Sequence, residues 1–217
     1  MPKAVCSTVS NVRIVDHNTL WYRVGVRKMA DFVNAGMCKL LDNGGKVTAE
    51  VEIDVQRLTR AGFSGYGDVI ELAEEPSEVI NRGHCDRYTD LANLSFTEGG
   101  QCGISLFQAK PYVLPHTLDL LERHPLGSQA FIPMHKEPFL IIVAPDNNGM
   151  PGEPVAFATS GSQAVNYHRN TWHGVLTPVG REGLFAVVDR IGGTGSNLEE
   201  HTLNTPFRIV DTNRLLA

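Results

Sequence analysis

The sequence contains no long apolar run, and no segment approaches the ~18 consecutive apolar residues that a membrane-spanning helix needs. It also contains no extended cluster of Lys and Arg, and its formal net charge is −5. Without a basic patch the chain lacks the electrostatic footprint of a protein that binds nucleic acid or anionic lipid. We therefore expect no nucleic acid and no membrane as partner, and a small molecule instead.

The chain is also poor in cysteine, and its four cysteines lie far apart, at Cys6, Cys38, Cys85 and Cys102. None of the close cysteine pairs typical of a zinc knuckle or a redox motif occurs. The first residues lack the basic start and the apolar stretch of a secretory signal. We expect reduced thiols and a cytoplasmic location.

The sequence does contain many short segments with the pattern of β-strands. Strict alternation of apolar and polar residues runs from Val47 to Val55. Further short apolar segments are bounded by Gly, Pro, Asn and Asp, which favour turns. These segments predict strands at Asp68–Leu72, Gly103–Ala109, Gln129–Pro133, Phe139–Ala144, Val155–Thr159, Ala164–His168, Leu184–Asp189 and Phe207–Val210.

One segment has loosely helical spacing instead. Its apolar residues predict a helix within residues 17–41, followed by a turn at Asp42–Gly45. Many short strands with so little helix indicate a sandwich, jelly roll or small barrel rather than a parallel α/β sheet. We expect an N-terminal extension of helix and strand, residues 1–48, followed by one mostly β domain, residues 49–217.

Three segments concentrate polar groups next to predicted strands: Asn81–Asp90, Leu121–Met134 and Asn166–His173. A polar group that enters a buried strand must be paired, solvated or used, because its isolated burial costs on the order of several kcal/mol. In the third segment, alternation places Asn166 and His168 on one face and Tyr167 and Arg169 on the other. A turn then follows at Asn170, since Asn tolerates left-handed backbone geometry.

The second segment has the spacing of a cupin metal motif, H-x-H-x(3,4)-E-x6-G, with other residue types. Glu122 and His124 occupy the first two ligand positions, and Gln129 follows after four residues. Lys136 occupies the position of the glycine in the motif. The third segment has the spacing of the second cupin motif, P-x-G-x-x-H, and ends at His173.

Because spacing fixes which side chains share a face, we expect Glu122, His124, Gln129 and His173 to converge in one barrel mouth. Two imidazoles, one carboxylate and one amide can hold a divalent ion such as nickel, zinc or manganese. Taken singly, each residue also has an ordinary structural interpretation. A charged neighbour pair such as Glu122 and Arg123 is usually a solvated ion pair, worth about 0–1 kcal/mol.

Five motifs, in this order, resemble the ureidoglycolate lyase family, formerly called ureidoglycolate hydrolase. They are GYGDVIE (Gly65–Glu71), the Arg87-Tyr88 pair, LERHPLGSQAFIP (Leu121–Pro133), NYHRNTWH (Asn166–His173) and DR-x-GG-x-x-x-NLEE (Asp189–Glu200). The similarity extends from about Glu50 to the C-terminus.

The resemblance implies a cupin-like double-stranded β-helix, or jelly-roll barrel, that is usually a homodimer. It also implies an enzyme of purine and allantoin catabolism, a carbon–nitrogen lyase that splits ureidoglycolate, a small anionic ureide, into glyoxylate and urea. The chain departs from the family pattern at three positions: Thr89 stands where His follows Arg-Tyr, Gln108 where Arg commonly precedes Ala-x-Pro, and Lys136 where Gly is usual.

Such an elimination needs a base for the hydroxyl, an acid for the departing urea and a cation for the carboxylate. We expect the catalytic groups among Glu122, His124, Gln129, His168 and His173, because imidazoles titrate near neutral pH. Arg binds a carboxylate through two parallel hydrogen bonds. The candidate substrate-binding residues are therefore Arg87, which we prefer, Arg123 and Arg169, together with Tyr167.

Two other functions remain open from the sequence. The same fold also serves metal-dependent oxygenases and isomerases, which would retain a metal ion. A barrel that binds a small ligand without catalysis is the other alternative, and the substitutions at Thr89, Gln108 and Lys136 are its only support.

Overall fold

The computed structural model describes residues 37–41 and 47–216. The chain divides into two compact units, Met1–Glu52 and Ile53–Ala217. In the first unit, β1 (Met37–Leu41) pairs antiparallel with β2 (Val47–Asp54), which continues into the second. The predicted helix is therefore wrong over Met37–Leu41, where pairing with an alternating strand overrides a loose helical spacing. The rest of that helix and the turn at Asp42–Gly45 lie outside the described residues.

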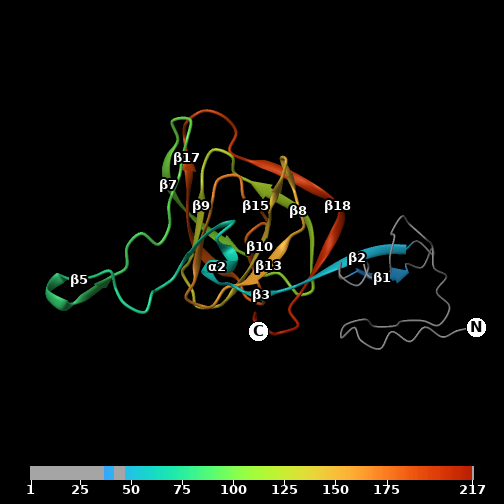
Figure 1. Ribbon diagram of the computed structural model, residues 1–217, viewed down its shortest axis with the longest axis horizontal. Coiled ribbons are helices and arrows are strands. Elements are labelled where there is room, and N and C mark those ends of the chain that lie inside the picture. Colours follow the sequence, from blue (N-terminus) through green and yellow to red (C-terminus); the bar gives the residue numbers. More distant parts are fainter. Residues whose placement is uncertain (1–36, 42–46, 217) are drawn as a thin grey trace, which may run out of the picture. The chain divides into compact units, whose positions relative to one another are not determined.

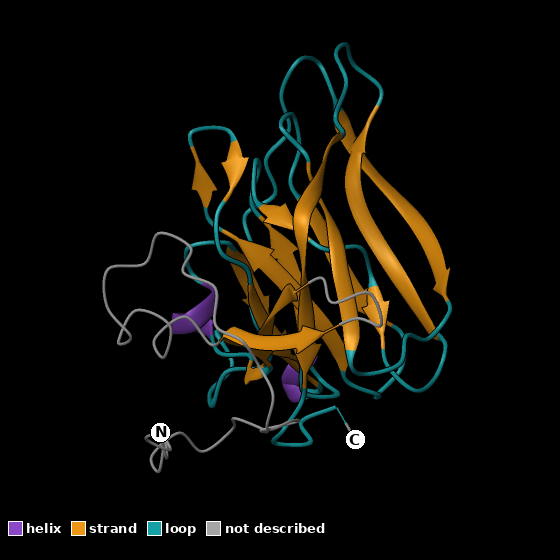
Figure 2. Ribbon diagram, turned by 90° about the vertical axis from the view of Figure 1, so that its right-hand side faces the viewer, coloured by secondary structure: helices purple, strands orange, loops and turns teal. Residues whose placement is uncertain are grey.

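The second unit contains most of a large sheet (Figures 1 and 2). The strands β18, β8, β15, β10, β13 and β3 are neighbours in this order, and β16 also pairs with β10. Their bounds are Glu199–Val210 (β18), His116–Arg123 (β8), Trp172–His173 (β15), Phe139–Ala144 (β10), Val155–Ala158 (β13), Gln56–Arg57 (β3) and Thr177–Pro178 (β16).

A five-stranded sheet has the order β4, β14, β9, β17 and β7. Its strands are Gly67–Ile70 (β4), Ala164–Tyr167 (β14), Gln129–Pro133 (β9), Gly183–Ile191 (β17) and Gln101–Ala109 (β7). All these pairs are antiparallel, which suits short connections between neighbouring strands.

The remaining elements are short. Two small hairpins pair β5 (Glu78–Ile80) with β6 (Cys85–Arg87), around the 3₁₀ turn η1 (Asn81–Gly83), and β11 (Asp146–Asn147) with β12 (Met150–Pro151). Figure 1 shows the β5–β6 hairpin extending away from the two sheets of the second unit. Helix α2 (Arg60–Phe63) begins at Thr59, whose side chain accepts a hydrogen bond from the amide of Gly62.

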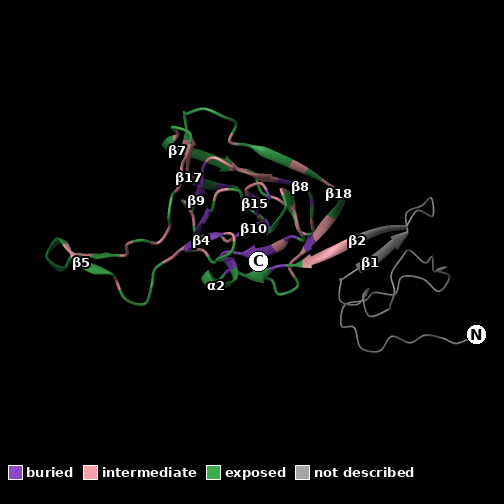
Figure 3. Cartoon of the chain, turned by 45° about the horizontal axis from the view of Figure 1, so that its top comes forward, coloured by how far each residue is buried: buried purple, intermediate pink, exposed green. Residues whose placement is uncertain are grey.

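Two apolar cores lie on the two faces of the large sheet. The first includes Ile141 and Val143 of β10 together with Phe131, Val165 and Phe185 of the smaller sheet, so it fills the space between the sheets. The second includes the alternate residues of β10 with leucines of β8. All six residues of β10 are consequently buried, which explains why its sequence is continuously apolar (Figure 3).

Two sheets around a shared core form a nearly closed, barrel-like arrangement. The prediction of a mostly β, cupin-like barrel is thus confirmed. The predicted strands are present, and Gln129–Pro133 and Phe139–Ala144 have the predicted bounds. Within the described part of the chain, no helix is both long and apolar enough to cross a bilayer.

Candidate active site

Two rows of polar side chains face each other between the sheets. On the large sheet, His173 of β15 pairs with Glu122 of β8, and His124 follows directly after β8. On the smaller sheet, Tyr167 of β14 pairs with Gln129 of β9. These strands place the residues beside the apolar core between the sheets, at one end of the barrel.

The first row brings Glu122, His124 and His173 together. Each of these side chains has a potential ligand atom within 4.8 Å of those of the other two. The two imidazole centroids are 5.2 Å apart, and His173 Nδ1 is 3.8 Å from Glu122 Oε1. Alternation along β8 explains the arrangement, because Glu122 and His124 both face His173. Arg123 points the other way, where it pairs with Asp146 and Glu199 and lies over Trp172.

Both imidazoles have a defined proton position. His124 Nδ1 is 2.6 Å from the carbonyl oxygen of Asn197, and His173 Nδ1 is 3.0 Å from that of Gly174. Since a carbonyl only accepts, each Nδ1 carries the hydrogen and each Nε2 keeps its lone pair. Both Nε2 atoms are buried and lack a hydrogen-bond partner among the described residues.

The Tyr167 ring is parallel to the ring of His173, with centroids 4.3 Å apart and an interplanar angle of 3°. Burial, and next the neighbouring His124, lower the pKa of His173 to about 3, although the hydrogen bond to Gly174 acts in the opposite direction. Burial raises the pKa of Glu122; His124 lowers it, and Glu200 raises it further. The site therefore holds a neutral imidazole beside a carboxyl group whose proton affinity is increased.

Two segments that are distant in sequence are joined directly at the site. The amide of Asn170 donates to the carbonyl oxygen of His124 at 3.1 Å, and Arg169 Nε donates to that of Pro125 at 3.0 Å. Asn170 has a φ of +64°, the left-handed geometry that its sequence position predicts. The turn between β14 and β15 thus lies against the end of β8.

The structure does not bring every candidate into this cavity. His168 is exposed and contacts Asp68, to which Asn166 also donates, so His168 and Asn166 do share a face, opposite Tyr167. Arg87 lies on the extended β5–β6 hairpin, exposed, with Glu78 as ion-pair partner at 3.5 Å (Figure 1). Neither residue reaches the Glu122 cluster within this chain.

Sequence reasoning missed Asp189, which was noted only as part of a motif. Asp189 follows the inward-facing Phe185 and Val187 on β17, and this alternation is the signal that could have identified it. Burial raises the pKa of Asp189, while a hydrogen bond from Gln129 and the proximity of His124 lower it.

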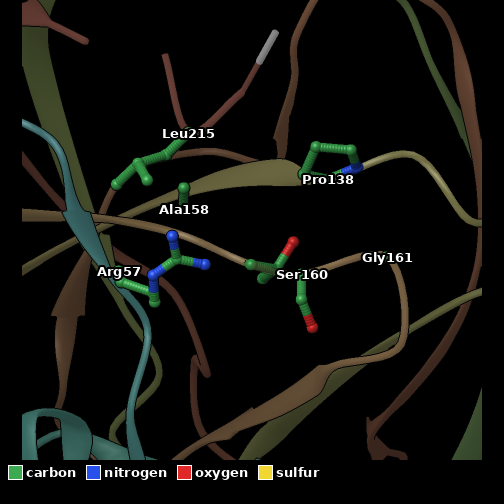
Figure 4. A pocket seen from close by; sticks show the side chains of 7 residues that line it. Arg57, Pro138, Ala158, Ser160, Gly161 and Leu215 are labelled. Carbon is green, nitrogen blue, oxygen red and sulfur yellow. The ribbon is translucent and has the colours of Figure 1, made fainter. Parts of the chain in front are cut away.

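A cavity of about 170 Å³ lies elsewhere, at the end of β13, with Arg57, Ala158 and Ser160 among its lining residues (Figure 4). Ala158 pairs with Leu140 of β10, whereas His173 pairs with Val143, three residues further along that strand. Among the residues that the structure describes, no carboxylate or imidazole lines this cavity, so its described lining lacks acid–base groups. The histidine and carboxylate cluster is the better candidate for chemistry.

The fold and the cluster together define a cupin-like barrel with a buried site of histidines and carboxylates. Residues 50–210 match the family model described as ureidoglycolate lyase. The chain therefore belongs to the ureidoglycolate lyase family.

Curated relatives agree with the family match. A ureidoglycolate lyase of Rhodobacter capsulatus is 50% identical over 155 residues, which are 71% of this chain and 96% of the relative. Ureidoglycolate lyase 2 of Rhizobium meliloti is 47% identical over 161 residues, or 73% of this chain and 98% of the relative. One from Agrobacterium fabrum is 41% identical over 160 residues, or 73% and 96%. This membership favours a lyase over an oxygenase, an isomerase or a non-catalytic binding protein.

Proposed function

We propose that the chain acts as a ureidoglycolate lyase whose reaction takes place at Glu122, His124 and His173. The substrate carries a hydroxyl and a ureido nitrogen on one carbon. Loss of the hydroxyl proton forms the C=O bond of glyoxylate as the C–N bond breaks, and the nitrogen gains a proton to leave as urea. The observation that supports this proposal most is two imidazoles beside the carboxyl group of Glu122, each with a buried Nε2 that has no partner among the described residues.

His124 is the proposed base. Its Nε2 takes the hydroxyl proton, and the Asn197 carbonyl that holds Nδ1–H stabilises the resulting imidazolium. The same Nε2–H then donates to the departing nitrogen, which is bonded to the same carbon as the hydroxyl. His173 is unsuited to this role because its low pKa, about 3, keeps the ring neutral.

His173 and Glu122 are proposed to bind and orient the substrate. His173 Nε2 accepts a hydrogen bond from it, with the ring fixed by Tyr167 and Gly174. Glu122, beside both imidazoles, stabilises the positive charge that His124 acquires. Gln129 lies opposite Tyr167 on the smaller sheet, and its Oε1 is buried without a partner among the described residues.

Arg169 is the proposed anchor for the substrate carboxylate. Its Nε is held by the carbonyl of Pro125, next to His124, and no partner of its terminal nitrogens is found within the described part of the chain. Arg123 is already engaged by Asp146 and Glu199. The preferred candidate, Arg87, would need another copy of the chain to bring it to this site.

The donor set also fits a divalent ion. Two imidazole lone pairs and a carboxylate with no buried hydrogen-bond donor among them are typical ligands for zinc, nickel or manganese. Glu122, His124 and His173 would hold the ion, with Gln129 as a further oxygen donor. When bound, such an ion supplies Lewis-acid chemistry that lowers the pKa of the substrate hydroxyl.

Several wider features are part of the proposal. Residues 49–217 form the lyase domain and residues 1–48 an N-terminal extension. The enzyme is a homodimer that works in the cytoplasm, and its reaction releases glyoxylate late in allantoin and purine breakdown.

Substitution of His124 tests the assignment. We expect His124→Gln to lower kcat about 10²–10⁴-fold, because a positioned acid–base group contributes about that much. Urea and glyoxylate release from ureidoglycolate is the measurement, with metal content determined on the same samples and after treatment with a chelator. The exposed His84→Gln is the matched control and should retain activity. Full activity of both His124→Gln and His173→Gln would remove the site from the proposal.

A further inference from the structure

Asp189 and Gln129 are cross-strand neighbours on the inner face of the smaller sheet. The register of β17 and β9 pairs Val187 with Phe131 and Val188 with Ala130, so the next position sets Asp189 opposite Gln129. Phe131 and Val187 belong to the core between the sheets, and Gln129 and Asp189 continue that face into the cavity. Side chains of such a pair lie within direct reach of each other.

The chemistry of this pair fixes the orientation of the amide. An ionised carboxylate only accepts hydrogen bonds, so an amide that faces it must present its N–H₂ group. The amide of Gln129 lies near enough to Asp189 to lower the pKa of that carboxyl, as an N–H₂ group directed at it does. Its carbonyl oxygen then points away from Asp189, and this Oε1 is the atom that is buried without a partner within the described chain.

With Gln129 in this orientation, the site presents mostly acceptors, although the hydroxyl of Tyr167, near Glu122, can donate. His124 Nε2 and His173 Nε2 are lone pairs because their Nδ1–H groups are used by carbonyls. Glu122 adds carboxylate oxygens and Gln129 adds its amide oxygen. Apart from a divalent ion, an occupant satisfies these acceptors only if it presents N–H or O–H donors. Were the amide reversed, an N–H₂ group would face the donors of the occupant and repel them.

We infer that Asp189 is a positioning residue that, by holding the amide of Gln129, makes the cavity selective for the N–H-rich ureido end of the substrate. This inference rests on the proposed function. The ureido group brings three N–H bonds and the neighbouring carbon a hydroxyl, all of which are donors. The carboxylate of the substrate, an acceptor, lies outside the acceptor-lined cavity, on the side of Arg169.

The test compares two small ligands of the same shape. Urea has four N–H donors, and acetone is its isostere with methyl groups in place of the amino groups. Binding of each is followed in the full chain by protein-observed NMR titration at millimolar concentrations. We expect urea to bind at least about tenfold more tightly than acetone, since unsatisfied buried acceptors penalise the ligand that lacks donors.

Three variants separate orientation from simple packing. Asp189→Leu frees the amide and should weaken urea binding about tenfold. Asp189→Asn retains one acceptor oxygen, so the loss should be smaller. The exchange Gln129→Glu with Asp189→Asn reverses donor and acceptor but still turns an oxygen towards the cavity, and it should restore urea binding. The exposed Asp119→Leu is the matched control, and thermal unfolding of every variant reports on folding.

Equal affinity for urea and acetone would overturn the inference, as would undiminished urea binding in Asp189→Leu. Failure of the exchange variant, with its fold intact, would overturn it too. Turnover of ureidoglycolate is measured separately. Selective urea binding without turnover would contradict the proposed function alone, whereas turnover with unselective binding would contradict only the role of Asp189.

Discussion

The pairing of His173 with Tyr167 keeps an imidazole neutral in a buried site. The ring is 1% exposed, stacks on Tyr167 and donates through Nδ1 to Gly174. A charged imidazole would lose its hydration there, and the neighbouring His124 disfavours the charge further. The Nε2 lone pair therefore remains available over the whole pH range in which the enzyme is expected to work.

This environment makes stability depend on pH. The pKa of His173 is about 3 in the folded chain and about 6.5 in the unfolded chain. Between these pH values the unfolded state therefore binds a proton that the folded state does not. The contribution of neutral His173 is complete above about pH 6.5 and is lost as the pH falls towards 3. We expect the free energy of unfolding to decrease across this window, and to do so less steeply in His173→Asn.

Guanidinium unfolding at a series of pH values is the measurement. His84→Asn, at an exposed position, should keep the slope of the unsubstituted protein. Identical slopes for His173→Asn and the unsubstituted chain would show that burial of this imidazole does not govern the acid sensitivity.

At the scale of single residues, alternation predicted the inward faces well. Glu122 and His124 share the cavity face while Arg123 faces away, as a period of two requires. Motif spacing does not identify Asp189, because spacing carries no information on strand register. Its contact with Gln129 depends on how β17 pairs with β9, and that pairing is a long-range property.

At the scale of the element, the turn between β14 and β15 connects the two halves of the site. Its Asn170 donates to His124, and its neighbour Arg169 donates to Pro125. The φ of +64° at Asn170 is accessible to Gly and Asn but strained for a β-branched residue.

We expect Asn170→Gly to be nearly neutral and Asn170→Val to cost about 1–2 kcal/mol in unfolding free energy. A shifted turn also displaces the His124 carbonyl, so kcat should fall in the valine variant alone. Thermal unfolding and steady-state kinetics measure the two effects. Asn147→Val is the control, because this exposed residue has no positive φ. If valine is tolerated equally at both positions, the turn does not order the site.

Individual strands could be located where a segment is bounded by turn residues and buried on both sides, as in Phe139–Ala144. Strand β8 was not predicted, although it carries Glu122. Its adjacent Leu120 and Leu121 interrupt the alternation, and the partner strand β18 has an irregular register between Thr202 and Phe207. The sequence of β8 therefore does not show the alternation that identifies a strand.

At the scale of the whole molecule, the outer face of the smaller sheet carries an apolar row over β7, β17 and β9. Ile104 is 77% exposed and Leu106 66%, both on the edge strand β7. Leu106 pairs with Ala186, which in turn pairs with the partly exposed Ile132, so these side chains form a continuous row. An exposed apolar row beside an unpaired strand edge is typical of a surface that another chain covers.

We expect this face to form the homodimer interface. Ile104→Lys combined with Leu106→Lys should convert a dimer into a monomer, because it places charges in a desolvated contact. Sedimentation velocity is the measurement, and Met150→Lys, on the separate β11–β12 hairpin, is the control. A dimer that survives the double substitution would assign the interface to another face.

The extent of this face could not be read from the sequence, since it depends on which strands are neighbours. Alternation identified Gly103–Ala109 and Leu184–Asp189 as strands but not as partners, and the outward position of the β5–β6 hairpin had no local signal. The family resemblance predicted the barrel fold and the reaction. The contacts between distant segments became known only from the strand register of the structure.

The β11–β12 hairpin divides the chain between the two groups of site residues. Glu122, His124 and Gln129 precede it, while Tyr167, His173 and Asp189 follow. A backbone nick at the exposed Asn148 would thus leave some of the proposed site residues on each fragment. Neither fragment alone would be active, and activity would return only when the two reassociate. The assembled barrel, rather than any contiguous segment of the chain, is therefore what activity requires.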